Sequence, residues 1–181
     1  MPIVDNKEIE ILFSSEEIAQ RNQEIAREIS QQDLYQLLVV PILKGAFVFA
    51  ADLVRALHEQ HVVCNIEFIT VSSYGAGKES KEIKILQDLT SDVKGRDILL
   101  IDDILESGRT LEFVVNLLKA RGARRVFVAV LLDKTARRKA KVHAQFVGFP
   151  CPDKFVVGYG MDCGHAFRQL PYIGSIVEDH T

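Results

Sequence analysis

The sequence lacks the cysteine pairs of a metal-binding or disulfide-linked module. Its three cysteines, Cys64, Cys151 and Cys163, are widely separated, and no CxxC pair occurs among them. A zinc ribbon or a disulfide framework would require paired cysteines at short, regular spacings. We therefore expect a protein whose thiols stay reduced.

Long apolar runs are missing as well. No run is long enough to span a bilayer, and the segment "MPIVDNKEIEILFS" lacks the basic start and the apolar core of a secretory signal. Internal repeats, low-complexity tracts and linkers are also absent. These features predict a soluble, cytoplasmic protein without a membrane partner.

The chain has no strong excess of one charge. Its 22 lysines and arginines stand against 25 aspartates and glutamates, which gives a formal net charge of −3. That balance argues against general electrostatic adhesion to nucleic acid, although it leaves room for a local basic patch. We expect no nucleic-acid partner.

Enough apolar material is present for one core, since 48% of the 181 residues are hydrophobic and 26% are charged. Segments with strand and helix patterns alternate along the chain. Strand patterns cover 34–43, 62–74, 94–103 and 124–132, and helix patterns cover 14–32, 46–61 and 109–123. The alternation predicts an α/β fold with a mostly parallel central sheet flanked by helices. Ser14 or Ser15 is expected to cap the first helix.

The chain ends are predicted to form a small hood on this sheet. Shorter strand-like segments follow Ala140, at 144–149, 154–160 and 172–177. We predict one domain over residues 1–181. Its core would cover roughly 35–140, and its hood would combine the N-terminal segment with roughly 145–181.

The segment "ILLIDDILESGRTLEFVV" places acids inside an apolar pattern. Asp102 and Asp103 follow four apolar residues, at the carboxyl end of a predicted strand, where open parallel sheets bind ligands. The polar loop after them includes Gly108, which permits close backbone approach. Backbone N–H groups at such a loop favour a phosphate, and the acids favour hydroxyls or a metal. An ordinary strand–loop–helix turn is the alternative, but it explains the adjacent carboxylates poorly.

The same stretch resembles the phosphoribosyl-diphosphate (PRPP) motif of the type I phosphoribosyltransferases. That motif has apolar residues, two acids, two apolar residues, an acid, a hydroxyl residue, Gly, any residue and Thr. Enzymes for orotate, adenine, uracil and 6-oxopurines share it. The segments "PILKGAFVFAADLVRAL", "SSYG", "LLDKTARR" and "PDKFVVGYGMD…FR" are similar to the bacterial hypoxanthine-guanine branch, in its order and over nearly the whole chain.

The resemblance implies the type I phosphoribosyltransferase fold and a role in purine salvage. Such an enzyme transfers a 5-phosphoribosyl group from PRPP to N9 of hypoxanthine or guanine, giving IMP or GMP and diphosphate, with Mg²⁺ as cofactor. It also implies a homodimer or homotetramer, and the apolar helix "AFVFAADLVRAL" is compatible with a subunit contact. Two alternatives remain: a xanthine-preferring enzyme, and a non-catalytic nucleotide-sensing regulator, which the acidic net charge and the single-domain length disfavour.

The resemblance assigns the PRPP-binding residues first. Asp102 and Asp103 would contact the ribose hydroxyls, directly or through metal-bound water. The 5′-phosphate would be cradled by Ser107, Gly108, Arg109 and Thr110, with a solvent-facing Arg109 as an equal alternative.

Glu106 departs from the family pattern, which usually has Asp at this position. Its carboxylate is retained, but the extra methylene shifts it, and small misplacements can be costly. We expect Glu106 to face purine N7 as a proton acceptor or donor. The alternative is that it only holds the loop geometry.

The resemblance assigns diphosphate binding to residues on three segments. These are Lys44, Gly45, Ser73, Tyr74 and Arg168. The Lys44–Gly45 peptide can be cis in such enzymes, whereas an ordinary turn would be expected without the resemblance. A loop that starts at Ser73 and contains Gly75, Gly77, Lys78 and Lys81 would close over the diphosphate.

The purine would be bound by residues near the C-terminus of the predicted core and in the hood. Lys134 would donate to the 6-oxo group, Phe155 would stack on the base, and Val156 would present its backbone. Asp162 would be a Mg²⁺ ligand, together with Asp102 and Asp103. Without the resemblance, Lys134 would be interpreted as a surface residue, Phe155 as core and Asp162 as a turn residue. The nearby cations Arg137, Arg138, Lys139 and Lys141 are interpreted as solvated.

Overall fold

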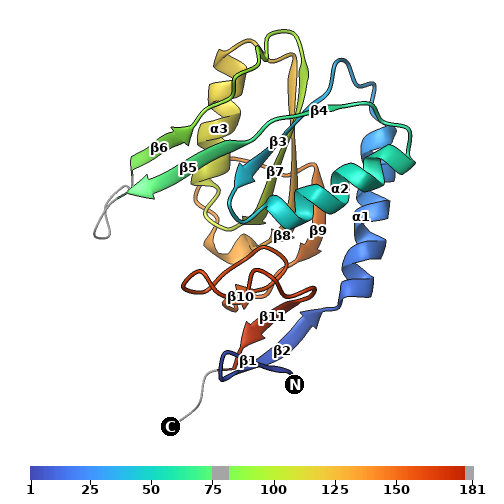
Figure 1. Cartoon of the computed structure of the whole chain (residues 1–181). Helices are drawn as coiled ribbons and strands as arrows, with labels where there is room; N and C mark the ends of the chain where they lie inside the picture. Colours follow the sequence, from blue (N-terminus) through green and yellow to red (C-terminus); the bar gives the residue numbers. More distant parts are fainter. Residues whose placement is uncertain (75–81, 178–181) are drawn as a thin grey trace.

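A seven-stranded sheet forms the centre of the fold (Figure 1). The computed structural model describes residues 1–74 and 82–177. Its strands are β3 (Leu38–Leu43), β4 (Asn65–Ile66), β5 (Ile69–Tyr74), β6 (Glu82–Gln87), β7 (Asp97–Leu105), β8 (Arg125–Asp133) and β9 (Phe146–Pro150). The order is β6-β5-β3-β7-β8-β9, and β4 pairs with β3. All of these pairs are parallel except the β5–β6 hairpin, so the predicted α/β fold with a mostly parallel sheet is confirmed.

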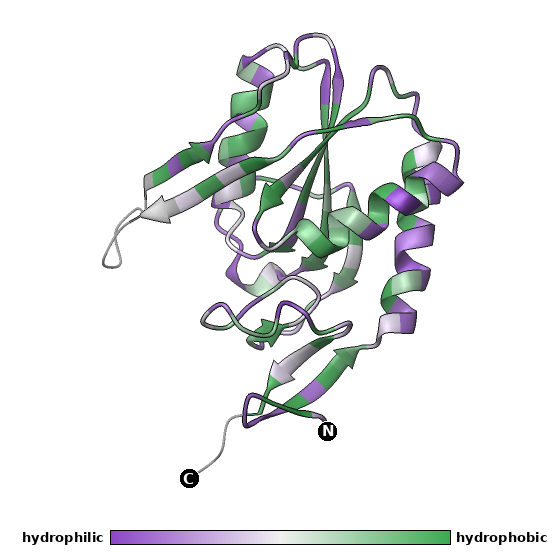
Figure 2. Cartoon of the chain, viewed as in Figure 1, coloured by the Kyte–Doolittle hydropathy of each residue, from purple (hydrophilic) through white to green (hydrophobic). Residues whose placement is uncertain are grey.

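Helices cover both faces of this sheet, as Figure 1 shows. They are α1 (Ser15–Ser30), α2 (Phe47–Glu59) and α3 (Arg109–Ala120). Alternate residues of β7 point to opposite faces: Leu99 and Ile101 pack in the core of α1 and α2, and Ile98 and Leu100 in the core of α3. The central strands are therefore mostly hydrophobic, whereas α1 is mixed (Figure 2). No helix among the described residues could cross a bilayer.

Side chains and backbone at the helix ends set where α1 and α3 begin and end. Ser14, one of the two predicted caps, forms a capping box with Glu17, whose carboxylate accepts from the Ser14 amide at 2.8 Å. Helix α3 begins after Gly108 and ends before Gly122, and both glycines have positive φ.

A second, antiparallel sheet brings the two chain ends together (Figure 1). It contains β1 (Ile3–Val4), β2 (Lys7–Phe13), β11 (Ile173–Ile176) and β10 (Val156–Val157), in that order. One part of the predicted hood is wrong, because β9 pairs in parallel with β8 and extends the central sheet. The remaining division into core and hood stays a prediction.

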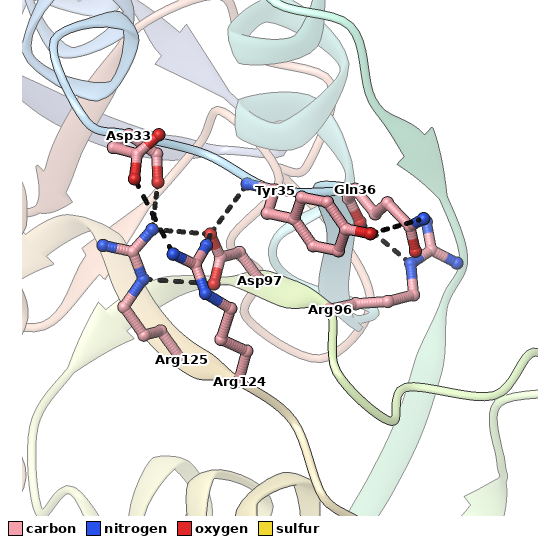
Figure 3. A network of polar contacts seen from close by, with 7 residues as sticks. All are labelled: Asp33, Tyr35, Gln36, Arg96, Asp97, Arg124 and Arg125. Atoms are coloured by element: carbon pink, nitrogen blue, oxygen red, sulfur yellow. Dashed lines mark hydrogen bonds and ion pairs between the residues drawn. The ribbon is translucent and has the colours of Figure 1, made fainter.

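A buried carboxylate ties the amino-terminal ends of β7 and β8 to the segment before β3 (Figure 3). Asp97 is fully buried and accepts from the Tyr35 amide at 2.8 Å, from Arg124 at 2.9 Å and from Arg125 at 2.7 and 3.1 Å. Burial alone would raise the pKa of Asp97. The hydrogen bonds from Arg125 and Tyr35 and the two guanidinium charges outweigh that effect, so its pKa lies below the ordinary value.

We expect Asp97→Asn to lower the free energy of unfolding by about 2 kcal/mol at pH 7, because charged hydrogen bonds to two arginines are lost. The folded-state pKa is lowered, so the contribution of Asp97 is complete above its unfolded-state pKa of about 4. It disappears as the pH falls through the lower folded-state value. Urea unfolding at pH 7, 4 and 3 should therefore show the gap between wild type and variant closing. Glu8→Gln, at an exposed acid, is the control, and a gap that stays constant to pH 3 would contradict the expectation.

Candidate active site

Two adjoining cavities open at the carboxyl end of the parallel strands. One of about 290 Å³ lies between the end of β3, the acids of β7 and the loop before α3. The other, of about 350 Å³, lies between the end of β8 and the segment that enters β10. Asp103, Ile104 and Glu106 line both cavities. A molecule that filled both would therefore meet these three residues at its middle.

Strand β7 continues to Leu105, beyond Asp103, where the predicted strand pattern ends. Its pairing with β8 extends through Asp102, opposite Val130, to Leu105, opposite Asp133. Asp102 and Asp103 are therefore held in a strand rather than a loop, which fixes both carboxylates at the cavity wall.

Burial raises the pKa of both carboxyls, and for Asp102 the adjacent Asp103 charge raises it further. Within residues 1–74 and 82–177, no salt bridge reaches either acid. No group of three or more His, Cys, Asp or Glu side chains in this part of the chain could hold a metal ion by itself. Two acids in a cavity without paired cations suit a divalent ion that takes its other oxygens from a ligand or water.

The diphosphate-loop candidate Gly45 is packed between Asp103 and Gly160. A Cβ on Gly45 would come within 1.8 Å of Asp103 Oδ2, and one on Gly160 within 2.3 Å of the Gly45 carbonyl oxygen. Lys44 is exposed. The cis peptide bond lies at Leu43–Lys44, one bond before the predicted position. Because Gly45 and Gly160 have no side chains, the segments that carry Gly45, Asp103 and Gly160 can meet at the cavity.

The phosphate-loop candidates surround the N-terminus of α3. Gly108, with φ of +79°, is the N-cap, and no side chain occupies the cap. The first N–H groups of the helix are thus available to an anion. Ser107, Gly108 and Thr110 line the first cavity, whereas Arg109 is exposed.

Arg138 fastens this loop from behind, so its interpretation as a solvated cation is wrong. Its guanidinium donates to the carbonyls of Glu106 at 3.1 Å, Leu105 at 3.2 Å and Val142 at 3.3 Å, and it pairs with Asp133. No local pattern distinguishes Arg138 from its basic neighbours, because its partners Leu105 and Glu106 lie more than 30 residues away in sequence.

Lys134 lies at the second cavity and is buried, so its interpretation as a surface residue is wrong. Its ammonium donates to the Lys154 carbonyl at 3.0 Å and lies 3.2 Å from Asp153 and 3.4 Å from Glu106. Phe155, 61% exposed, and the buried Val156 also line this cavity. The exposed Phe155 ring therefore lies beside a cavity with a buried cation.

Asp162 and Arg168 bind one another. Asp162 lines the second cavity, and its carboxylate lies 2.8 Å from the Arg168 guanidinium, which also donates to the Gly160 carbonyl at 2.6 Å. Ser73 and Tyr74 end β5, but the structure describes only their backbone. The predicted loop residues Gly75, Gly77, Lys78 and Lys81 lie outside the described residues.

The model of the phosphoribosyl transferase domain family matches residues 8–163. The chain belongs to the phosphoribosyltransferase family. This confirms the resemblance inferred from "ILLIDDILESGRTL".

Among the relatives of this phosphoribosyltransferase are two curated enzymes. The hypoxanthine-guanine phosphoribosyltransferase of Bacillus subtilis is 44% identical over 167 residues, covering 91% of each chain. That of Dictyostelium discoideum is 40% identical over 173 residues, covering 94% of this chain and 96% of the relative. A crystal structure of the Staphylococcus aureus hypoxanthine phosphoribosyltransferase superposes with a TM-score of 0.87 at 40% identity, covering 93% of this chain and 91% of the other.

We expect Gly160→Ala to destabilise this phosphoribosyltransferase by about 3 kcal/mol, because its Cβ would collide with the Gly45 backbone. Gly164→Ala is the matched control, since Gly164 also has positive φ but a Cβ there would meet nothing within 4 Å. Backbone strain alone should cost that variant about 1 kcal/mol. Urea unfolding measures both values, and equal losses would refute the close contact.

We expect Arg138→Gln to loosen the loop before α3. Backbone amides 139 and 140, which donate to the Ser107 carbonyl at 3.0 Å, should exchange with solvent about tenfold faster, or about 1.4 kcal/mol less protected. Arg138→Lys should not restore protection, because an ammonium cannot reproduce the planar guanidinium fork. Lys141→Gln, at an exposed lysine, is the control. Unchanged amide exchange in both Arg138 variants would show that the hydrogen bonds of Arg138 do not stabilise this loop.

Proposed function

We propose that this enzyme transfers the 5-phosphoribosyl group of PRPP to N9 of a 6-oxopurine, hypoxanthine, guanine or both, and so serves purine salvage. The bond from C1′ to the diphosphate oxygen breaks, the bond from C1′ to N9 forms, and the purine loses a proton. The proposal rests above all on buried Lys134 beside a cavity that continues into the acids and loop of the PRPP motif.

The first cavity would bind the sugar phosphate. The N–H groups before α3, with Ser107 and Thr110, would hold the 5′-phosphate, and Asp102 and Asp103 would hold the ribose hydroxyls. Arg138 would keep the loop in its binding shape. Fixing the ribose orients C1′ toward the base before the bond to diphosphate weakens.

Diphosphate would leave toward the chain segments that meet at Gly45. The amide of Gly45, which lines the first cavity, and the guanidinium of Arg168, which binds the Gly160 carbonyl and Asp162, would be donors to it, and Lys44, Ser73 and Tyr74 are the further residues we assign to this role. Mg²⁺, when bound, supplies positive charge against the diphosphate oxygens. Asp102, Asp103 and Asp162 are the carboxylates that would hold it.

The second cavity would select and orient the purine. Lys134 has donors and no acceptor, so it favours a 6-oxo over a 6-amino group. Phe155 would cover the base, and the backbone of Val156 would meet its edge. Glu106, where the two cavities meet, would face N7 and accept or donate the purine proton.

We also propose a cytoplasmic, one-domain homo-oligomer, as a dimer or tetramer. Exposed apolar side chains at the start of α2 and around β4 support a subunit contact there. These are Phe47, Val63, Ile66 and Phe68. The three cysteines are free, which fits a reducing compartment.

We expect diphosphate release from PRPP and Mg²⁺ with hypoxanthine or guanine, at a kcat/KM at least about a hundredfold above that with adenine. EDTA should abolish the reaction. Lys134→Gln should lower kcat/KM for the oxopurines about a hundredfold through loss of the charged donor, whereas Lys141→Gln, at an exposed lysine, should not. Competition among hypoxanthine, guanine and xanthine measures the base preference. Absence of diphosphate release with every oxopurine, accompanied by RNA binding, would favour a regulator and sink the proposal.

A further inference from the structure

The Lys134 ammonium lies among three oxygen groups, one of which it binds by a hydrogen bond. Its contacts are the Lys154 carbonyl, Asp153 Oδ1 and Glu106 Oε1. An ammonium has three N–H bonds. A purine 6-oxo group that approaches Lys134 therefore competes with these three partners for its N–H bonds.

A second cation that lines the same cavity contacts the same two carboxylates. Arg137 lies 3.3 Å from Glu106 Oε1 and 3.0 Å from Asp153 Oδ1. Lys134 and Arg137 thus alternate with the two carboxylates in a ring of four charges, in which each carboxylate touches both cations. Arg137 ends the short helical turn Thr135–Arg137 that directly follows Lys134.

The partners of Lys134 differ in how readily they can leave. The Lys154 carbonyl belongs to the backbone that leads into Phe155 and β10. Glu106 lines both cavities and reaches Lys134 at 3.4 Å, the longest of the three contacts. Glu106 is therefore the partner that an incoming 6-oxo group displaces. Without a second cation its freed carboxylate would have no fixed place beside the purine.

We propose that Arg137 and Asp153 are positioning residues for the two groups that meet the purine. This inference rests on the function proposed above. Arg137 retains Glu106 beside N7 when the base takes its place on Lys134. Asp153 retains Lys134 at the cavity wall, where the ammonium faces the 6-oxo group.

Stability is a poor explanation for this ring of charges. The side chains of Arg137 and Asp153 are 60% and 47% exposed, and exposed ion pairs contribute little to folding. Lys134 lowers the pKa of Asp153, with Arg137 adding to the effect, so Asp153 stays ionised beside Lys134 near neutral pH. The ring of charges therefore sets the positions of the Lys134 and Glu106 side chains and contributes little to the stability of the fold.

The two positions should affect different kinetic constants. Lys134 contacts the base already in the ground state, so Asp153→Asn should raise the KM for hypoxanthine about tenfold and change kcat by less than threefold. Glu106 acts as the proton moves, so Arg137→Gln should lower kcat about tenfold with little change in KM. Arg137→Lys keeps a cation and should recover most of that loss. Melting temperatures should stay within about 2 °C of wild type.

The experiment is steady-state kinetics of all variants with PRPP, Mg²⁺ and hypoxanthine, beside Lys141→Gln and Glu8→Gln as controls at exposed residues. Arg137→Gln and Asp153→Asn with the kinetic constants of wild type would overturn this inference while leaving the proposed function intact. Equal losses in Arg137→Lys and Arg137→Gln would also overturn it, because the charge would then be irrelevant. A wild-type protein that forms no nucleotide would overturn both.

Discussion

The pairing of β7 with β8 is the constraint on which both ends of the molecule depend. The two strands keep one register from Asp97, opposite Arg125, to Leu105, opposite Asp133. At one end the pair buries the Asp97 carboxylate among arginines. At the other it carries Asp102 and Asp103 to the cavity wall and lets Arg138 span from Asp133 to the loop before α3. The carboxyl ends of parallel strands lie at the same edge of a sheet. The pairing that holds β7 in the core therefore also sets the position of Asp102 and Asp103 at the cavity.

Charge is distributed unequally across the site. On the side proposed for the purine, the cations already have carboxylate partners, with which a base would compete. On the side proposed for the sugar phosphate, Asp102 and Asp103 are half-buried, have raised pKa values and are unmatched by salt bridges in the described chain. Binding there gains from a ligand that brings its own cation. The two cavities therefore discriminate by different physical means.

Local sequence pattern predicted the features that depend on adjacent residues. Apolar runs alternating with helical spacing predicted the α/β fold, Ser14 was one of two expected caps, and the order of acids, Gly108 and Thr110 indicated the phosphoribosyltransferase family. The sequence did not single out Arg137, Arg138 or Asp153, because their partners are distant in sequence. Nothing in "DKTARRKAK" distinguishes the two arginines from the other cations. The predicted strand ended at Asp103 rather than Leu105, because the pairing of Ile104 and Leu105 with β8 cannot be read from the local pattern. β9 was misassigned because a short strand does not reveal which sheet it joins.

The contact among Asp103, Gly45 and Gly160 also has a genetic consequence. Every single-base change in a glycine codon that alters the amino acid without ending the chain introduces a Cβ, which would meet the Gly45 backbone at Gly160 and would displace the Asp103 carboxylate at Gly45. No side chain is small enough to serve as an intermediate step. The turn after β3 and the turn before Arg168 can therefore diverge in evolution only around these two glycines, or by a coordinated rebuilding of both segments.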